Sequence, residues 1–160
     1  MSSLTFHLPD AAATERVGAR LAPHLGGGML VTLQGDLGTG KTTLVRGVLR
    51  ARGIEGPVKS PTYTLVEHYP VSSLYFYHFD FYRFMSADEW DDAGFSEYFR
   101  DDSVCLVEWP ERVAGLLRAP DLALSLSYGT PDGRELVVAA HSPAGERCLS
   151  VLAAEATPSP

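Results

Sequence analysis

The chain is poor in several residue types, and each shortage excludes a class of protein. Its two cysteines, Cys105 and Cys148, lie far apart and can build neither a disulfide framework nor a cysteine-rich metal site. No apolar run reaches the roughly 18 residues of a membrane-spanning helix. The first residues include Asp10 and Glu15 and lack the basic-then-apolar pattern of a secretory leader. We therefore expect a cytoplasmic protein with no membrane segment, in which Cys105 is a small buried apolar residue.

Asparagine is absent altogether, and lysine is scarce. GTPases of the usual kind recognise guanine through an Asn-Lys-x-Asp segment, so the missing asparagine argues against that class. Lys41 and Lys59 are the two lysines among 13 basic residues. In such an arginine-rich chain, a lysine indicates a position that needs a compact ammonium group instead of a planar guanidinium. Lys41 meets that description, whereas Lys59 is either functional or an ordinary surface lysine.

Negative charge is concentrated in the middle of the chain, which has a net charge of −7 overall. Residues 61–112 hold three basic and eleven acidic side chains, a charge of −8, whereas residues 1–60 carry +3. This acidic middle would repel the phosphates of a nucleic acid, so we do not expect the chain to bind nucleic acid on its own. The charge fits a Mg²⁺ site and a docking surface for a basic partner.

The most specific motif is a glycine-rich loop. Residues 35–42 read GDLGTGKT and fit G-x-x-x-x-G-K-S/T, the phosphate-binding P-loop. Residues 29–33 before it form an apolar run typical of a buried parallel strand, and apolar residues at helical spacing follow it. In such a loop the backbone N–H groups bind phosphate, Lys41 reaches the β- and γ-phosphates, and the Thr42 hydroxyl is a Mg²⁺ ligand. We therefore expect a nucleoside triphosphate to bind here.

Two carboxylates follow predicted strands, at the carboxyl ends where open α/β sheets bind ligands. Glu108 ends the apolar run 104–107, as in a Walker-B strand, and Asp80 ends the aromatic run 76–79. An isolated acid at a strand end is usually a solvated charge. Beside a P-loop, we expect Glu108 to lie near the phosphates and Mg²⁺, with Asp80 close by. Trp109 is a candidate contact residue.

Residues 62–81 allow more than one interpretation. Thr62 and Thr64 either belong to a switch loop that senses the γ-phosphate and Mg²⁺ or lie at an ordinary strand edge. An aromatic row further along fits core packing better than stacking on bases. This row consists of Tyr75, Tyr77, Phe79 and Phe81.

The pattern along the chain predicts one α/β domain over residues 1–156 and a disordered tail at 157–160. We expect three layers, α/β/α, around a mixed sheet that contains antiparallel strands. Strands are expected at 4–6, 29–33, 62–69, 73–79, 104–107, 122–128 and 135–140, with a hairpin loop at 129–133. Helices are expected from Asp10 to about Leu25, from the P-loop to Gly53, from a capping box at 86–89 to Gly94, at 95–99 and at 144–154.

Four segments resemble the TsaE (YjeE) family, the small P-loop ATPases of bacterial tRNA threonylcarbamoyladenosine synthesis. Their order and spacing match from about residue 29 to residue 112. The Ser-Pro-Thr and Val-Glu-Trp-Pro parts are specific to that family among P-loop proteins. The segments are 35–43 (GDLGTGKTT), 58–67 (VKSPTYTLVE), 77–83 (YHFDFYR) and 105–111 (CLVEWPE).

The resemblance implies a function and a site. TsaE proteins work with TsaB and TsaD, which attach threonylcarbamoyl to adenosine 37 of tRNAs that read ANN codons. The ATP cycle resets that complex, so tRNA is met only through it. ATP and Mg²⁺ would bind with Thr42 and Glu108 near the metal, Asp80 would be important for hydrolysis, and Arg134 would lie by the adenine. Nucleotide contacts would come from Asp36, Leu37, Gly38, Thr39, Gly40, Lys41, Thr42 and Thr43. Switch or partner contacts are expected at Lys59, Ser60, Thr62, Thr64 and Trp109.

Two other functions stay open. A small-molecule kinase would need an arginine-bearing lid over the phosphates, for which Arg112 and Arg118 are sparse. A docking protein gated by nucleotide, without turnover, also fits the acidic middle. Four intact residues argue against it: Lys41, Thr42, Asp80 and Glu108. In an ATPase, Lys41 and Mg²⁺ would neutralise the phosphates, and either Glu108 or Asp80 would orient the attacking water. The chain has no obvious arginine finger, so we expect slow hydrolysis by the isolated protein.

Overall fold

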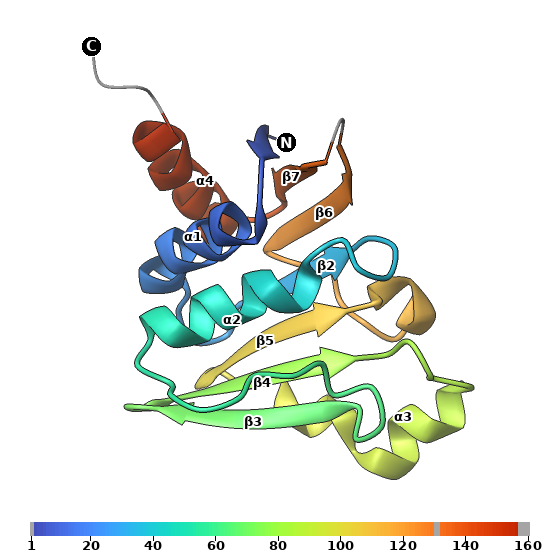
Figure 1. Ribbon diagram of the computed structural model, residues 1–160. Helices are drawn as coiled ribbons and strands as arrows, with labels where there is room; N and C mark the ends of the chain where they lie inside the picture. The colour runs from blue at the N-terminus through green and yellow to red at the C-terminus, as the bar shows by residue number, and fades with distance from the viewer. Residues whose placement is uncertain (1, 130–131, 157–160) are drawn as a thin grey trace.

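The chain folds around one seven-stranded sheet with helices on both sides (Figure 1). The computed structural model describes residues 2–129 and 132–156. The strands are β1 (Ser3–Leu8), β2 (Leu30–Gln34), β3 (Val66–Val71), β4 (Leu74–Asp80), β5 (Ser103–Glu108), β6 (Leu122–Tyr128) and β7 (Arg134–Ala140). The helices are α1 (Ala11–Leu21), α2 (Lys41–Ala51), α3 (Ala87–Ala93) and α4 (Pro143–Ala156), with the 3₁₀ turns η1 (Ala22–His24), η2 (Phe95–Tyr98) and η3 (Pro110–Val113). In the described ranges, none of the helices has the length and apolar character that crossing a membrane requires.

The P-loop strand β2 lies at the centre of the sheet, whose order is β1-β7-β6-β2-β5-β4-β3. The four central strands β6, β2, β5 and β4 are parallel neighbours. The pairs β1–β7, β7–β6 and β4–β3 are antiparallel. β5 is buried along its whole length, as expected of a parallel strand covered on both faces. The predicted mixed sheet is confirmed.

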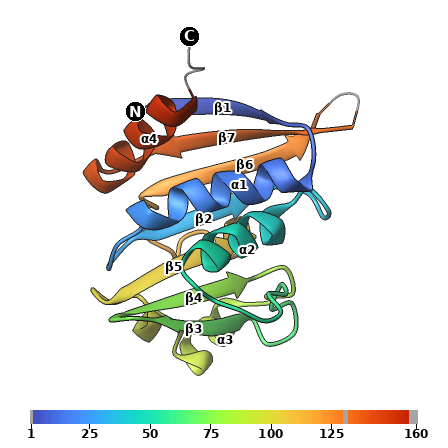
Figure 2. The ribbon, with the colours of Figure 1, turned by 60° about the vertical axis from the view of Figure 1, so that its left-hand side comes forward.

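Helices α1, α2 and α4 cover one face of the sheet, and α3 with η2 covers the other (Figures 1 and 2). Alternate residues of β4 and β5 therefore enter two different cores. Phe76 and Leu106 pack into the larger core beside α1 and α2. Phe79 and Val107 pack into a smaller core that includes Trp90. The three-layer arrangement is confirmed, and three members of the predicted aromatic row are buried in the smaller core.

Helices α1 and α2 approach each other so closely that each requires a glycine at the contact. A Cβ added to Gly18 would lie 2.2 Å from the carbonyl oxygen of Leu44. A Cβ added to Gly47 would lie 2.1 Å from the carbonyl oxygen of Glu15. Both distances are far below van der Waals contact, so a larger residue would push the helices apart. This packing fixes the position of α2, whose first residue is the P-loop lysine Lys41.

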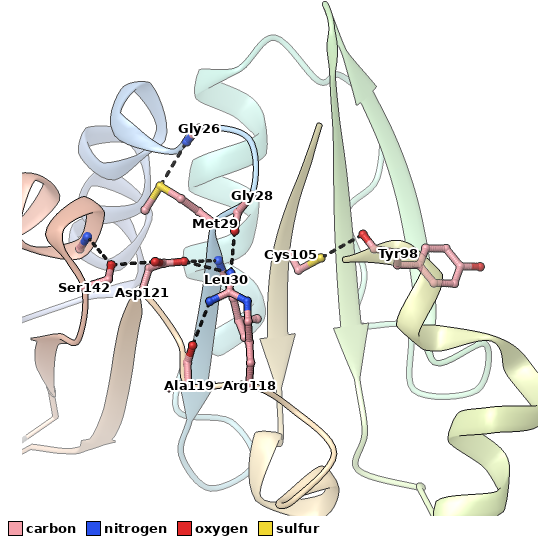
Figure 3. Close-up of polar contacts among 11 residues, drawn as sticks. Gly26, Gly28, Met29, Leu30, Tyr98, Cys105, Arg118, Ala119, Asp121 and Ser142 are labelled. Carbon is pink, nitrogen blue, oxygen red and sulfur yellow. Dashed lines mark hydrogen bonds and ion pairs between the residues drawn. The ribbon is translucent and has the colours of Figure 1, made fainter. Parts of the chain in front are cut away.

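Asp121 holds together the end of the sheet opposite the P-loop (Figure 3). Its Oδ2 accepts hydrogen bonds from the Leu30 N–H at 2.8 Å and from Arg118 at 3.2 Å. Its Oδ1 accepts a hydrogen bond from the Ser142 hydroxyl at 2.7 Å. Burial alone raises the pKa of Asp121, but these donors outweigh burial and hold it below the ordinary value. The ionised carboxylate therefore connects the starts of β2, β6 and α4.

The strand expected at 62–69 was predicted too early, because β3 begins only at Val66. The residues before it form a turn in which the Leu65 N–H donates to the Pro61 carbonyl at 2.7 Å. Leu65 has a φ of 69°, in the left-handed region. The β-branched residues of this segment favour a strand locally, but the turn is fixed by contacts to β4, since the Asp80 N–H donates to the Leu65 carbonyl.

The helix predictions are correct in place and differ at the ends. Asp10 caps α1 through a hydrogen bond from the Ala13 N–H, but α1 ends at Leu21 and η1 follows. Ser86 is the N-cap of α3 as expected, yet its side chain makes no capping hydrogen bond. The predicted capping box is therefore wrong, because the Glu89 carboxylate accepts from the Met85 N–H instead. The expected tail at 157–160, and residues 130–131 of the expected hairpin loop, lie outside the described residues.

Candidate functional site

The loop between β2 and α2 needs its glycines for conformational reasons. Gly35, Gly38 and Gly40 have φ values of 151°, 81° and 107°, which residues with a Cβ rarely adopt. A Cβ on Gly35 would also lie 2.5 Å from the carbonyl oxygen of Leu126. Gly40 is the N-cap of α2, so the loop ends at a helix N-terminus. The free N–H groups and the dipole of that terminus favour an anion.

Lys41 is a buried ammonium group at the start of α2, only 4% exposed. Its Nζ donates to the Gly35 carbonyl at 2.5 Å and lies 3.8 Å from the centre of a Trp109 ring. Burial lowers the pKa of Lys41, and the carboxylates of Glu108 and Asp80 oppose that effect. A bound phosphate would supply further negative charge, which favours the charged form of the lysine.

Glu108 ends β5 beside the first turn of α2. Its Oε2 accepts a hydrogen bond from the Thr42 hydroxyl at 3.0 Å. The same oxygen lies 2.6 Å from Nε2 of His78. Glu108 is 2% exposed and His78 is fully buried. The structure thus brings the predicted metal-site pair together and adds a histidine to it.

Asp80 lies beside Glu108 because the parallel strands β4 and β5 pair these two residues. Oδ1 of Asp80 accepts from the Tyr82 N–H at 2.9 Å. Its Oδ2 accepts from the hydroxyl groups of Ser60 and, at 3.5 Å, of Thr62. The turn before β3 is therefore attached to the end of β4 through two hydroxyl groups.

These groups face one open cavity of about 320 Å³. The cavity lies at the carboxyl ends of β2, β4 and β5, the position at which open α/β sheets bind ligands. Asp36 and Thr39 lie outside its lining, and the Thr39 hydroxyl donates to the Asp36 carbonyl at 2.8 Å within the loop. The lining residues are Leu37, Gly38, Gly40, Lys41, Thr42, Thr43, Ser60, Thr62, Asp80, Tyr82, Glu108 and Trp109.

A second cavity of about 150 Å³ lies along the other side of the P-loop. Arg134, the first residue of β7, lines it together with Thr39 and Thr43. The guanidinium of Arg134 donates to the Gly38 carbonyl at 3.3 Å and lies 4.6 Å from the centre of the Tyr128 ring. The structure thus brings Arg134 to the P-loop backbone.

Two members of the predicted switch group lie away from the main cavity. Lys59 and Thr64 line a separate groove of about 410 Å³, together with Tyr63, which is 81% exposed. Ser60 and Thr62 line both the groove and the main cavity. The segment therefore connects an exposed surface to the buried carboxylate at the end of β4.

Two residues of the site were not among the predicted site residues. A histidine inside a predicted strand favours core packing over a place near the site, and His78 is packed, but it also contacts Glu108. Its position two residues before Asp80 on one strand, and so on the same face, was the available signal. Tyr82 lines the cavity with its ring centre 4.9 Å from that of Trp109, and no sequence pattern indicated this contact.

The oxygen groups around the main cavity fit a magnesium ion. The Thr42 hydroxyl and the carboxylates of Glu108 and Asp80 are hard oxygen ligands, which Mg²⁺ prefers. In nucleotide enzymes, Mg²⁺ usually takes one or two protein ligands and completes its octahedron with phosphates and water. The cavity places such oxygen groups beside the P-loop.

Residues 8–136 match the family model for threonylcarbamoyl adenosine biosynthesis protein TsaE. The chain belongs to the TsaE family. Similar proteins include tRNA threonylcarbamoyladenosine biosynthesis protein TsaE of Haemophilus influenzae, 41% identical over 94% of this chain and 98% of that protein. The Bacillus subtilis protein of the same name is 35% identical over 88% and 87% of the two chains. The crystal structure of Bacillus subtilis YdiB is similar with a TM-score of 0.83 and 28% identity, over 98% of this chain and 97% of that one.

The four segments that resemble TsaE proteins all reach the main cavity. Segments 35–43 and 58–67 contribute the P-loop and the hydroxyl-bearing turn. Segments 77–83 and 105–111 contribute the ends of β4 and β5. The motifs of the TsaE family are thus distant in sequence and adjacent in the fold.

Proposed function

We propose that this chain is the ATP-binding and ATP-hydrolysing member of the machinery that forms threonylcarbamoyladenosine at position 37 of tRNAs reading ANN codons. It would act with the TsaB and TsaD proteins and meet tRNA only through that complex. One observation carries the proposal: Lys41, Thr42, Asp80 and Glu108 converge on a single cavity in a chain of the TsaE family.

Binding of ATP is supported by the positive end of the cavity. The N–H groups of the loop, the N-terminus of α2 and the Lys41 ammonium would together neutralise the phosphates. Thr42 and Glu108 would hold Mg²⁺, which supplies charge neutralisation during phosphoryl transfer. Residues 36–43 would follow the phosphate chain, and the nucleoside would extend toward the second cavity beside Arg134.

Hydrolysis requires that one carboxylate orient the attacking water. Glu108 is engaged with Thr42 and His78 on the metal side, which favours a metal role for it. Asp80 faces the same cavity from the next strand, and the hydrogen bonds that it accepts come from the Tyr82 N–H and from two hydroxyl groups that can rotate. We therefore assign the water to Asp80.

Regulation by a partner would act through the turn attached to Asp80. Ser60 and Thr62 contact that carboxylate, and Lys59 and Thr64 lie on the exposed groove next to them. A partner that occupies the groove would change the surroundings of Asp80, and Trp109 would add a contact at the cavity mouth. Turnover would then be slow in the isolated chain and different in the complex.

The decisive experiment follows the γ-phosphate of labelled ATP. The chain is tested alone and then with TsaB, TsaD and tRNA. Slow release of free phosphate that changes when the partners arrive is the expected result. Transfer of the label to a small molecule would identify a kinase instead. Bound ATP without turnover under every condition would leave a nucleotide-gated docking protein.

A further inference from the structure

His78 is a buried polar side chain that the roles above leave unused. It lies in β4 with no exposed surface, and its Nε2 is 2.6 Å from Oε2 of Glu108. Its Nδ1 is also buried and, among the residues that the structure describes, has no hydrogen-bond partner. A histidine kept only for packing would normally satisfy both ring nitrogens or be replaced by an apolar residue.

The two nitrogens indicate which way the hydrogen bond runs. If Nδ1 carried the proton, it would be a buried donor without an acceptor, which costs more than a bare ring nitrogen. The proton therefore belongs on Nε2, which donates to the carboxylate of Glu108. At 2.6 Å between Nε2 and Oε2, this is a short hydrogen bond.

The consequence is that Oε2 of Glu108 receives two donors, the Nε2–H of His78 and the hydroxyl of Thr42. A Thr42 hydroxyl that binds a metal ion through a lone pair keeps its proton, and that proton can rotate away from Glu108. The ring of His78 is fully buried in β4, so it is the donor held in place. It keeps in one orientation the carboxylate that lines the cavity.

We propose that His78 is a positioning residue, which holds the Glu108 carboxylate in the orientation that binds the Mg²⁺ of Mg²⁺–ATP. The inference rests on the proposed function. It goes beyond a packing role, because the geometry links His78 to metal affinity instead of to the fold. Removal of a group that orients a metal ligand typically lowers metal affinity by about 10- to 100-fold.

The test compares two polar substitutions of equal charge. In His78→Gln the amide nitrogen can reach the former position of Nε2, whereas in His78→Asn it lies near that of Nδ1. Binding of a fluorescent ATP analogue is measured while Mg²⁺ is titrated, and again in excess chelator. We expect His78→Asn to need about 10- to 100-fold more Mg²⁺ for half-maximal enhancement of binding. His78→Gln should stay within about threefold of the native value, and binding in chelator should not change.

Phe76→Leu serves as a matched control for damage to β4. Phe76 is fully buried two residues earlier on the same face, packs into the larger core and is paired with Val104 of β5. It should lower the melting temperature and leave the Mg²⁺ requirement unchanged. An unchanged requirement in His78→Asn, or an equal change in Phe76→Leu, overturns the inference while the proposed function stands. If the native chain bound no nucleotide in a Mg²⁺-dependent way, the proposed function would fall and this inference with it.

Discussion

Substitution of Asp80 by asparagine separates binding from hydrolysis. Asparagine keeps the size of the side chain and an oxygen that can accept the Tyr82 N–H, now bonded at 2.9 Å. The hydroxyls of Ser60 and Thr62 can turn to accept from the new amide group, so no buried donor is left without a partner. What disappears is the negative charge that orients and polarises water. Loss of such a group lowers the rate by about 100- to 10,000-fold.

The assay for Asp80→Asn is phosphate release in a single turnover, at saturating ATP and Mg²⁺, with ATP affinity measured on the same sample. We expect affinity within about threefold of native and a rate lower by at least about 100-fold. Glu108→Gln is the comparison, because at Glu108 the loss should appear first as a higher Mg²⁺ requirement. Near-native turnover in Asp80→Asn would refute the assignment. So would a Glu108→Gln protein that stays inactive once Mg²⁺ saturates it while Asp80→Asn hydrolyses ATP.

Three further substitutions test the fold and the outer parts of the site. Asp121→Asn should lower the free energy of unfolding by about 2 kcal/mol at pH 7, since donors to a charged group are lost. In the folded protein the pKa of Asp121 lies below its ordinary value of 3.8, so the stability difference between native and variant is complete above pH 3.8 and is lost as pH falls through the folded pKa. Urea unfolding that gave equal stability differences at pH 7 and pH 3 would contradict this prediction. Gly47→Ala should cost about 1–3 kcal/mol by the same measurement, because its Cβ would meet the Glu15 carbonyl, and unchanged stability would show that α1 and α2 can separate freely. Arg134→Ala should weaken ATP binding about three- to tenfold without changing the rate at saturation, and an unchanged affinity would remove Arg134 from the nucleotide site.

The central part of the fold could be predicted from short patterns, and the turn before β3 could not. Residues 30–33 and 104–107 are short, mostly apolar runs typical of a strand buried on both faces. The turn is different, because its local preference for a strand is opposed by contacts from other elements. The Asp80 N–H binds the Leu65 carbonyl, and the Ser60 hydroxyl binds the Asp80 carboxylate. A short window of sequence around residue 62 does not reach Asp80, the partner in both contacts.

In the site, too, the residues of known motifs could be predicted from the sequence, whereas the contacts between distant residues could not. The P-loop can be recognised from the sequence because each residue type in the motif binds one group of the ligand. The acids at strand ends could be predicted because the carboxyl ends of parallel strands lie at the same edge of a sheet. The contact of His78 with Glu108 depends on how β4 is aligned with β5, which the sequence does not state. The scarcity of lysine left Lys59 either functional or an ordinary surface lysine, and the structure places it on a groove next to the cavity and not in it.

The packing of apolar residues in β4 determines the positions of the polar residues of the site. In β4, Phe76, His78 and Asp80 share the face toward α2, while Phe79 alternates onto the face toward α3. If β4 shifted by one residue, His78 and Asp80 would point into the smaller core and Phe79 would point away from it. The pairing of Asp80 with Glu108 is therefore enforced by the packing of Phe79 on the opposite face. An aromatic residue outside the site thus helps to determine where the carboxylates of Asp80 and Glu108 lie.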